Sequence, residues 1–236
     1  MKKSLQFVGA IALTFAVGGA QATSLTDLLG GASITIGDKL FDDFQFIYED
    51  TSDFHTVDTD NIEVTGLADN GSGYGLRFEI LDDEFMVQGD DIYAYLDYSF
   101  GFHVSVLDPG YLINGVSLEG LLAGTSRDPD GFNDIGSYIL ESVGTASMLD
   151  DLGVLDAEHS VLDDVVFTDL GGSVNFAGRS EIWVVKNIAV WAQDSTDNAH
   201  LDGFDQRFSQ VAVPVPGPLA LIALGLVGLG WSRRSS

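Results

Sequence analysis

The segment 128–134 reads Asp-Pro-Asp-Gly-Phe-Asn-Asp and contains the strongest candidate metal ligands of the sequence. Asp128, Asp130 and Asp134 place carboxylates around a glycine, so they can converge on a hard cation such as Ca²⁺, which takes about six to eight oxygen ligands. The pattern departs from an EF-hand loop, because Phe132 occupies a ligand position and no glutamate follows at the twelfth position. Asp, Pro, Gly and Asn are also the common turn residues. The segment is therefore either a calcium site or a turn. A melting temperature that rises in Ca²⁺, but not in Na⁺ at matched ionic strength, distinguishes the two.

The aromatic residues form a second candidate group. Trp191 follows Trp183 by eight positions, and an even spacing puts both side chains on one face of an extended strand. Tyr93 and Tyr95 share a face in the same way, and Tyr98 lies on the opposite face. Sugars stack on such rings, but protein cores also contain them. These residues are candidates for a polysaccharide-binding face or for core packing.

Catalytic motifs are missing from the sequence. It contains neither the Gly-x-Ser-x-Gly turn of serine hydrolases nor a phosphate-binding Gly-x-Gly-x-x-Gly loop. The four histidines, His55, His103, His159 and His200, lie far apart without a metal-ligand spacing, so structural or surface roles are expected for them. We predict that the protein is not an enzyme and that it uses no cofactor, with Ca²⁺ as the candidate exception.

The elements that must position these residues are strands. Apolar residues alternate with small or polar ones over Tyr74–Ile80, and residues 92–100 and 182–191 are apolar on both faces, as central strands of a sandwich are. Gly and Asp clusters separate the runs, and 28 glycines argue against a helical domain. The prediction is an all-β fold, an antiparallel, jelly-roll-like β-sandwich of 9 to 12 strands over residues 23–210. One short helix is expected near Ser24–Leu29, capped by Ser24 or Thr26.

Charge and cysteine content restrict the function. The sequence has ten basic and 36 acidic residues. Without Lys2, Lys3, Arg233 and Arg234, six basic residues remain and the net charge is −30. Because phosphate binding requires clustered Lys and Arg, nucleic acid is excluded as a partner. The chain has no cysteine, so burial rather than disulfide bonds must hold the domain together.

Both ends of the chain have the composition of targeting segments. Residues 1–22 begin with a basic Met-Lys-Lys, continue with an apolar run and end at Ala20-Gln21-Ala22, the pattern of a signal peptide. Signal peptidase is therefore expected to cut between Ala22 and Thr23. This places the following domain outside the inner membrane.

Residues 211–236 combine a Pro-rich segment, an apolar run and an arginine pair. The run from Leu219 to Trp231 has no polar side chain, so lipid is its natural environment. As a helix it spans roughly 20 Å, less than the ~30 Å of a hydrocarbon core. We expect a short transmembrane helix with Arg233 and Arg234 on the cytoplasmic side. A buried core helix is the alternative.

The Pro-rich segment carries a family resemblance. Val213, Pro214, Val215 and Pro216, followed by the apolar run and the arginine pair, resemble the PEP-CTERM sorting tail of exopolysaccharide-producing Gram-negative bacteria, with Val215 in the place of the family's glutamate. The resemblance implies an exosortase-like protease as a partner. It also implies a transient inner-membrane anchor, followed by delivery to the cell surface or the extracellular space.

Three functions remain open at this point. The first is a non-catalytic surface or matrix protein, associated with exopolysaccharide or biofilm and a candidate for cation binding. The second is an enzyme that acts on extracellular glycans. The third is an acidic solubility or adhesion module without a specific ligand. Glycan binding without turnover favours the first.

Overall fold

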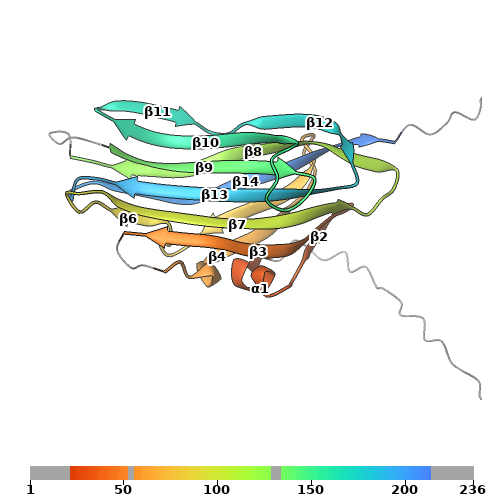
Figure 1. Cartoon of the computed structure of the whole chain (residues 1–236), viewed down its shortest axis with the longest axis horizontal. Coiled ribbons are helices and arrows are strands. Elements are labelled where there is room, and N and C mark those ends of the chain that lie inside the picture. Colours follow the sequence, from red (N-terminus) through yellow and green to blue (C-terminus); the bar gives the residue numbers. More distant parts are fainter. Residues whose placement is uncertain (1–21, 53–55, 129–133, 214–236) are drawn as a thin grey trace, which may run out of the picture.

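In the part of the chain that the structure describes, two antiparallel sheets pack face to face (Figure 1). The computed structural model describes residues 22–52, 56–128 and 134–213. Sheet A has the spatial order β1 (Thr23–Ser24), β4 (Ile62–Leu67), β5 (Tyr74–Ile80), β14 (Asn198–Ala212), β8 (Tyr111–Ser126) and β12 (Ser173–Arg179), and β6 (Met86–Gln88) also pairs with β14. Sheet B has the order β11 (Val165–Asp169), β10 (Gly153–Leu162), β9 (Asp134–Gly144), β13 (Glu181–Ala192), β7 (Ala94–Val106), β3 (Lys39–Thr51) and β2 (Ile34–Ile36).

This architecture confirms the predicted all-β antiparallel sandwich; the jelly-roll description stays a prediction. The strand predicted at Tyr74–Ile80 is β5, and the run 182–191 lies inside β13, between β9 and β7 in the middle of sheet B. The described residues contain two sheets of seven strands, more than the 9 to 12 strands expected. Three of the strands, β1, β2 and β6, have only two or three residues. A strand this short is below the length at which a period-two pattern is recognisable.

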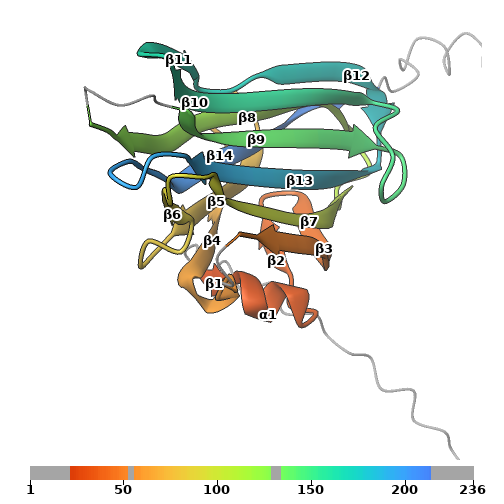
Figure 2. The same ribbon diagram turned by 60° about the vertical axis from the view of Figure 1, so that its left-hand side comes forward.

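The predicted short helix is α1 (Leu25–Leu29), which covers one edge of the sandwich (Figure 2). The side-chain oxygen of Ser24 accepts a hydrogen bond from the backbone N–H of Asp27 at 3.2 Å, so Ser24 is the cap. The hydroxyl of Thr26, the other candidate, instead bonds Thr59 Oγ1 at 2.6 Å in the 3₁₀ helix η1 (Thr59–Asn61). Leu25 and Leu28 are fully buried, which anchors the helix on the core.

A set of phenylalanines joins the two sheets. Phe41 of sheet B contacts Phe208 of sheet A with ring centroids 5.4 Å apart, and Phe100 contacts Phe78 at 5.6 Å. Each of these rings is at most 1% exposed. Burying such a side chain contributes about 1.5–3 kcal/mol. Burial of this kind stabilises a domain that has no disulfide.

A charged pair lies in the same core. Lys186 of β13 donates to Glu141 of β9 and to the side-chain oxygen of Gln206 of β14, and all three side chains are fully buried. Gln206 Nε2 donates to Glu141 Oε1 at 3.0 Å and to the backbone oxygen of Ser117 at 2.9 Å. Burial raises the pKa of Glu141 and lowers the pKa of Lys186. Because Gln206 belongs to sheet A and the ion pair to sheet B, these residues link the sheets.

Aspartate pairs serve as turns. Asp163 and Asp164 have φ angles of 47° and 65° and connect Leu162 to its cross-strand partner Val165. Two consecutive positive φ angles define the tight hairpin turn that Asn, Asp and Gly favour. Asp82–Asp83 has the same conformation, with φ angles of 54° and 57°. The chain therefore uses adjacent aspartates where the backbone must adopt a left-handed conformation.

Asp69 gives a test of stability against pH. Its Oδ1 accepts backbone N–H bonds from Gly71 at 2.8 Å and Gly73 at 2.9 Å, which lower its pKa below the ordinary 3.8. A carboxyl group whose pKa is lower in the folded state stabilises the fold at pH values above its unfolded-state pKa. This stabilisation is lost as the pH falls through the folded-state pKa. Asp69→Asn keeps an acceptor oxygen but not the charge. We expect urea unfolding to show a less stable variant at pH 7 and a smaller difference near pH ~3. An equal difference at both pH values would show that the charge is not responsible.

Candidate functional site

The outer face of sheet B carries a group of solvent-accessible aromatic residues. On β13, Ile182, Val184 and the following even-numbered residues point into the core, so Trp183 and Trp191 point outward and are half-buried. Figure 1 shows this sheet in front of sheet A. The prediction that both tryptophans share a face is confirmed.

The register of sheet B aligns one row of side chains across five strands. Trp191 of β13 is directly opposite Tyr95 of β7 on one side and Gly136 of β9 on the other. The row continues through Ser160 of β10 to Phe167 of β11. A Cβ on Gly136 would lie 2.8 Å from the Trp191 ring, so the absence of a side chain lets the indole lie over the sheet. Small residues therefore separate the aromatic ends of the row.

Trp191 and its aromatic neighbours are held by carboxylates. Trp191 Nε1 donates to Asp134 Oδ1 at 2.8 Å, and Tyr95 Oη donates to Asp50 Oδ2 at 3.0 Å. The Tyr93 ring lies 6.2 Å from the Tyr95 ring, and its side chain is 43% exposed. Tyr98 packs in the core at 1% exposure, as its opposite direction on the strand requires. Of the predicted aromatic candidates, Tyr93, Tyr95 and Trp191 lie together; Trp183 lies further along β13 beside His103, with ring centroids 5.2 Å apart.

A polar network adjoins this cluster. Tyr48 Oη donates to Asp97 Oδ2 at 2.8 Å, and Asn187 Nδ2 donates to Asp97 Oδ1 at 2.7 Å and to Tyr48 Oη. Tyr138 of β9 is opposite Ala189 of β13 in the row next to Trp191. The sequence pattern did not single out these residues, because β3, β7, β9 and β13 are distant along the chain.

The phenols of this face stay protonated at neutral pH. Burial, followed by the hydrogen bond to Asp97, raises the pKa of Tyr48 to about 12. The bond to Asp50 raises the pKa of Tyr95, and burial raises the pKa of Tyr93 and Tyr138, with Asp134 and Asp156 as further causes. The face therefore presents neutral hydroxyl groups beside carboxylate acceptors. We define the aromatic face as Tyr48, Tyr93, Tyr95, Asp97, Tyr138, Asn187 and Trp191.

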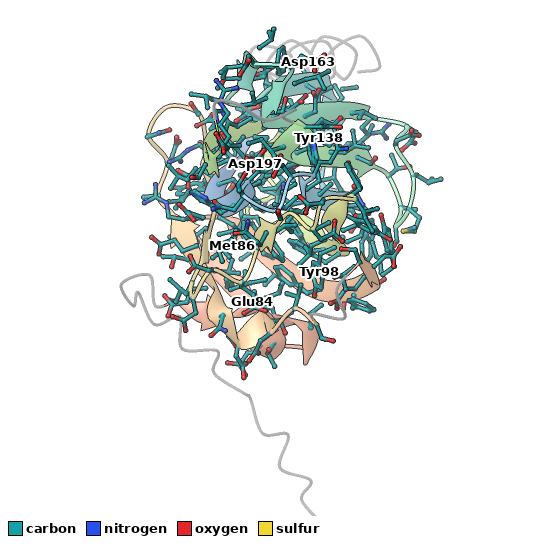
Figure 3. The ribbon with its side chains drawn as sticks, turned by 90° about the vertical axis from the view of Figure 1, so that its left-hand side faces the viewer. Glu84, Met86, Tyr98, Tyr138, Asp163 and Asp197 are labelled. Carbon is teal, nitrogen blue, oxygen red and sulfur yellow. The ribbon has the colours of Figure 1, made fainter. Side chains whose placement is uncertain are left out.

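A cavity of about 520 Å³ lies at the β10–β11 hairpin. Its lining is Glu158, Ser160, Leu162, Asp163, Val165 and Phe167. Ser160 and Phe167 belong to the row that starts at Tyr95, so the cavity continues the aromatic face. Figure 3 looks along the strands from this end and shows Asp163 above Tyr138.

Sheet A has a depression of a different character. It measures about 240 Å³ and is lined by Ser72, Val116, Ser117, Glu119, Ser173, Asn175 and Ser209. Hydroxyl and amide groups are available there, but the lining contains no aromatic ring. The outer face of sheet B is the better candidate site.

The predicted calcium ligands lie partly outside the described residues, because Asp130 belongs to the undescribed segment 129–133. Asp134 holds the indole of Trp191, and the backbone N–H of Asp128 donates to Asp197 Oδ1 at 3.0 Å. Asp197 is fully buried at this end of the sandwich. Calcium binding at Asp128, Asp130 and Asp134 stays a prediction.

A metal-type cluster that the sequence did not indicate lies on β3 and β7. One ligand atom each from Asp42, Asp43 and His103 lies within 4.8 Å of the others, and His103 Nδ1 and Asp42 Oδ1 are 2.9 Å apart. Adjacent residues of a regular strand face opposite sides. Here the register shifts after Asp42, and Asp43 has a φ of 49°. This β-bulge brings both carboxylates to one histidine.

The ends of the folded domain adjoin the predicted processing sites. Thr23, the predicted mature N-terminus, starts β1 and pairs with Val64, whereas Ala20 lies outside the described residues. β14 continues to Ala212, two residues beyond the predicted boundary at 210, because it still pairs with β8 there. The backbone N–H of Val213 donates to the oxygen of Gly110 at 2.8 Å.

The remaining sorting residues, Pro214, Val215, Pro216, Arg233 and Arg234, lie outside the described residues, as does the predicted apolar helix. Within residues 22–52, 56–128 and 134–213, no helix has the length and apolar character needed to cross a membrane.

Residues 212–234 match the PEP-CTERM protein-sorting motif. The chain carries a PEP-CTERM sorting motif. This confirms the resemblance that Val213–Pro216 and the arginine pair indicated. The PEP-CTERM motif is a recognised exosortase substrate signal and implies export to the cell envelope or surface. It starts at Ala212, the last residue of β14, so the sorting signal follows the sandwich directly.

Among the solved structures that match, the similarity to a carbohydrate-binding module is weak. TmCBM61, in complex with β-1,4-galactotriose, is 12% identical, and the match covers 70% of this chain and 88% of that one with a TM-score of 0.24. Such a score is too low to support a shared fold or ligand. No curated protein matches the chain in sequence.

Proposed function

We propose that this protein is a non-catalytic surface protein that binds extracellular polysaccharide through its aromatic face. The observation that carries the proposal is the position of the Trp191 indole. It lies over Gly136, with Tyr95 on its other side in the same row. A sugar ring has an apolar face that stacks on such a ring and hydroxyl groups that need donors and acceptors. Tyr48, Asp97 and Asn187 supply these groups beside the stacking position.

An enzyme that acts on extracellular glycans is the alternative. A glycoside hydrolase needs a carboxylic acid with a raised pKa at the substrate. Burial raises the pKa of Glu141, but this side chain is fully enclosed between the sheets and cannot reach a substrate. Glu141, whose pKa is raised by burial, therefore cannot act as the catalytic acid of a glycoside hydrolase.

The test measures binding and turnover on the same samples. Full-length protein in detergent is mixed with soluble polysaccharides, and both bound polymer and newly formed reducing ends are quantified. Binding without new reducing ends is expected. New reducing ends would establish the enzyme, and the absence of binding to every polymer would leave an acidic solubility or adhesion module.

The route to the surface is also a proposal. Signal peptidase cuts between Ala22 and Thr23, the apolar run anchors the precursor in the inner membrane of a Gram-negative bacterium, and an exosortase-like protease then cuts near Pro214. That β1 starts at Thr23 supports the first cut, because it leaves the whole sandwich intact. The match at residues 212–234 supports the second.

Replacing Pro214 and Pro216 with alanine is expected to leave an uncut precursor in the membrane. Proline keeps the preceding residue extended, which presents the segment to a protease. Intact-mass measurement of the protein from cells should give a mature form from Thr23 to near Pro214 for wild type, and a variant about two dozen residues heavier. A wild-type mass that still includes Trp231 and the arginine pair would show an ordinary anchor.

A further inference from the structure

The charged groups on and around the aromatic face are all carboxylates, so the charge there is negative. The outer side of sheet B carries the carboxylates of Asp50, Asp97, Asp134, Asp156 and Glu158 on β3, β7, β9 and β10. Two of them face each other directly, because Asp50 and Asp97 are cross-strand partners. Their hydrogen bonds come from Tyr95, Tyr48 and Asn187, which are neutral donors. The acidic charge of the face is therefore not neutralised by its own hydrogen bonds.

None of the Lys and Arg side chains of the described residues belongs to the aromatic face. Lys39 and Lys186 are fully buried in the core. Arg77 and Arg207 belong to β5 and β14 of sheet A, and Arg179 ends β12 of the same sheet. Arg127 pairs with Asp164 at the tip of the β10–β11 hairpin, at 2.9 Å. A uronate or sulfate group placed on the aromatic face would meet like charges without a cation to receive it.

The length of the row indicates an extended ligand. From Tyr95 on β7 to Phe167 on β11 the row crosses four strand spacings, about 19 Å at ~4.8 Å each. Gly136 and Ser160, in the middle of the row, have small side chains or none. The 520 Å³ cavity lies at the other end of the row, where Ser160 and Phe167 line it. A single sugar would occupy only part of this path.

From this arrangement we infer that the aromatic face binds extended, uncharged polysaccharides and rejects polymers that carry uronate or sulfate groups. The inference rests on the proposed function, and it adds the class of ligand. Neutral chains offer ring faces to Trp191 and Tyr95 and hydroxyl groups to the carboxylates, which accept hydrogen bonds strongly. Anionic chains lose these contacts to repulsion, which salt screens in part.

The experiment compares neutral polymers (hydroxyethylcellulose, mannan and galactan) with anionic ones (alginate and chondroitin sulfate). Full-length protein in detergent is titrated with each polymer at low ionic strength. We expect at least one neutral polymer to bind at least tenfold more tightly than either anionic polymer. Equal or tighter binding of an anionic polymer would overturn the inference while leaving polysaccharide binding intact. If none of the five polymers binds, the proposed function itself fails.

A charge-reversal variant tests whether the face is responsible. Asp156→Lys places a cation on the outer side of β10, where Asp156 is exposed. Asp202→Lys on β14 of sheet A changes the net charge equally at another exposed site and is the matched control. We expect Asp156→Lys to tighten alginate binding at least threefold and Asp202→Lys to leave it unchanged. Equal effects of the two variants would assign the selectivity to net charge and overturn the assignment to this face.

Discussion

Replacing Trp191 with alanine is expected to weaken polysaccharide binding by about 30-fold. Truncating a central aromatic residue of a binding surface costs about 2 kcal/mol or more, which corresponds to this factor. Trp191 lies inside the row, between Tyr95 and Gly136, and is the aromatic ring flanked on both sides by other members of the row. The measurement is a titration of wild type and variant with the neutral polymer that wild type binds most tightly.

The matched control is Trp183→Ala. Trp183 is half-buried, belongs to the same strand and projects from the same face. It lies eight residues from Trp191, about 27 Å along a strand, outside the aromatic face. We expect this variant to bind within threefold of wild type and both variants to retain the melting transition. If Trp183→Ala weakens binding as much as Trp191→Ala does, the aromatic face is not the binding site.

The buried ion pair gives the largest expected change in stability. Removing one partner of such a pair costs about 3–5 kcal/mol, because the other charge stays buried without compensation. We expect this loss in the free energy of unfolding for Glu141→Leu and for Lys186→Met, measured by urea denaturation. The double variant removes both charges and is expected to recover most of the loss, since apolar replacement of a buried pair is often close to neutral.

A surface pair serves as the comparison. Arg77 and Asp205 are 2.8 Å apart, and Arg77 is 48% exposed. Exposed pairs contribute about 0–1 kcal/mol, so Asp205→Ala should cost much less than either core replacement. If the double core variant is as unstable as the sum of its single variants, the two charges do not interact energetically.

A strand could be predicted from the sequence where the alternation of apolar and polar residues within that strand was enough to identify it. β5 has the bounds that its alternation predicts, and the even spacing of Trp183 and Trp191 predicts their common face. The pattern over Ile182–Trp191 predicts a strand that is apolar on both faces, but Lys186 points inward there. Its partners Glu141 and Gln206 come from β9 and β14, and strand periodicity contains no information about such distant partners.

The structure places the predicted aromatic candidates in two different environments, again because of contacts between strands that are distant along the chain. Tyr93, Tyr95 and Tyr98 are close in sequence, yet Tyr98 is in the core and the other two are on the surface. Which face of β7 is covered depends on sheet A, which packs on one side of sheet B only. The even spacing of Tyr93 and Tyr95 predicted their common face, and packing decided that this face is the outer one.

The sequence by itself determined the sorting motif of this protein and its fold class. Proteases and membranes recognise short contiguous segments, so the motif at residues 212–234 is readable without any fold. Period-two alternation likewise acts between neighbouring residues and predicts a β-sandwich. Tertiary structure decided the candidate site, because the register of β7, β13 and β9 places Tyr95, Trp191 and Gly136 side by side, and the β-bulge at Asp43 joins Asp42 to His103. Register depends on contacts between distant strands, and a shift of one residue would turn every one of these side chains to the other face.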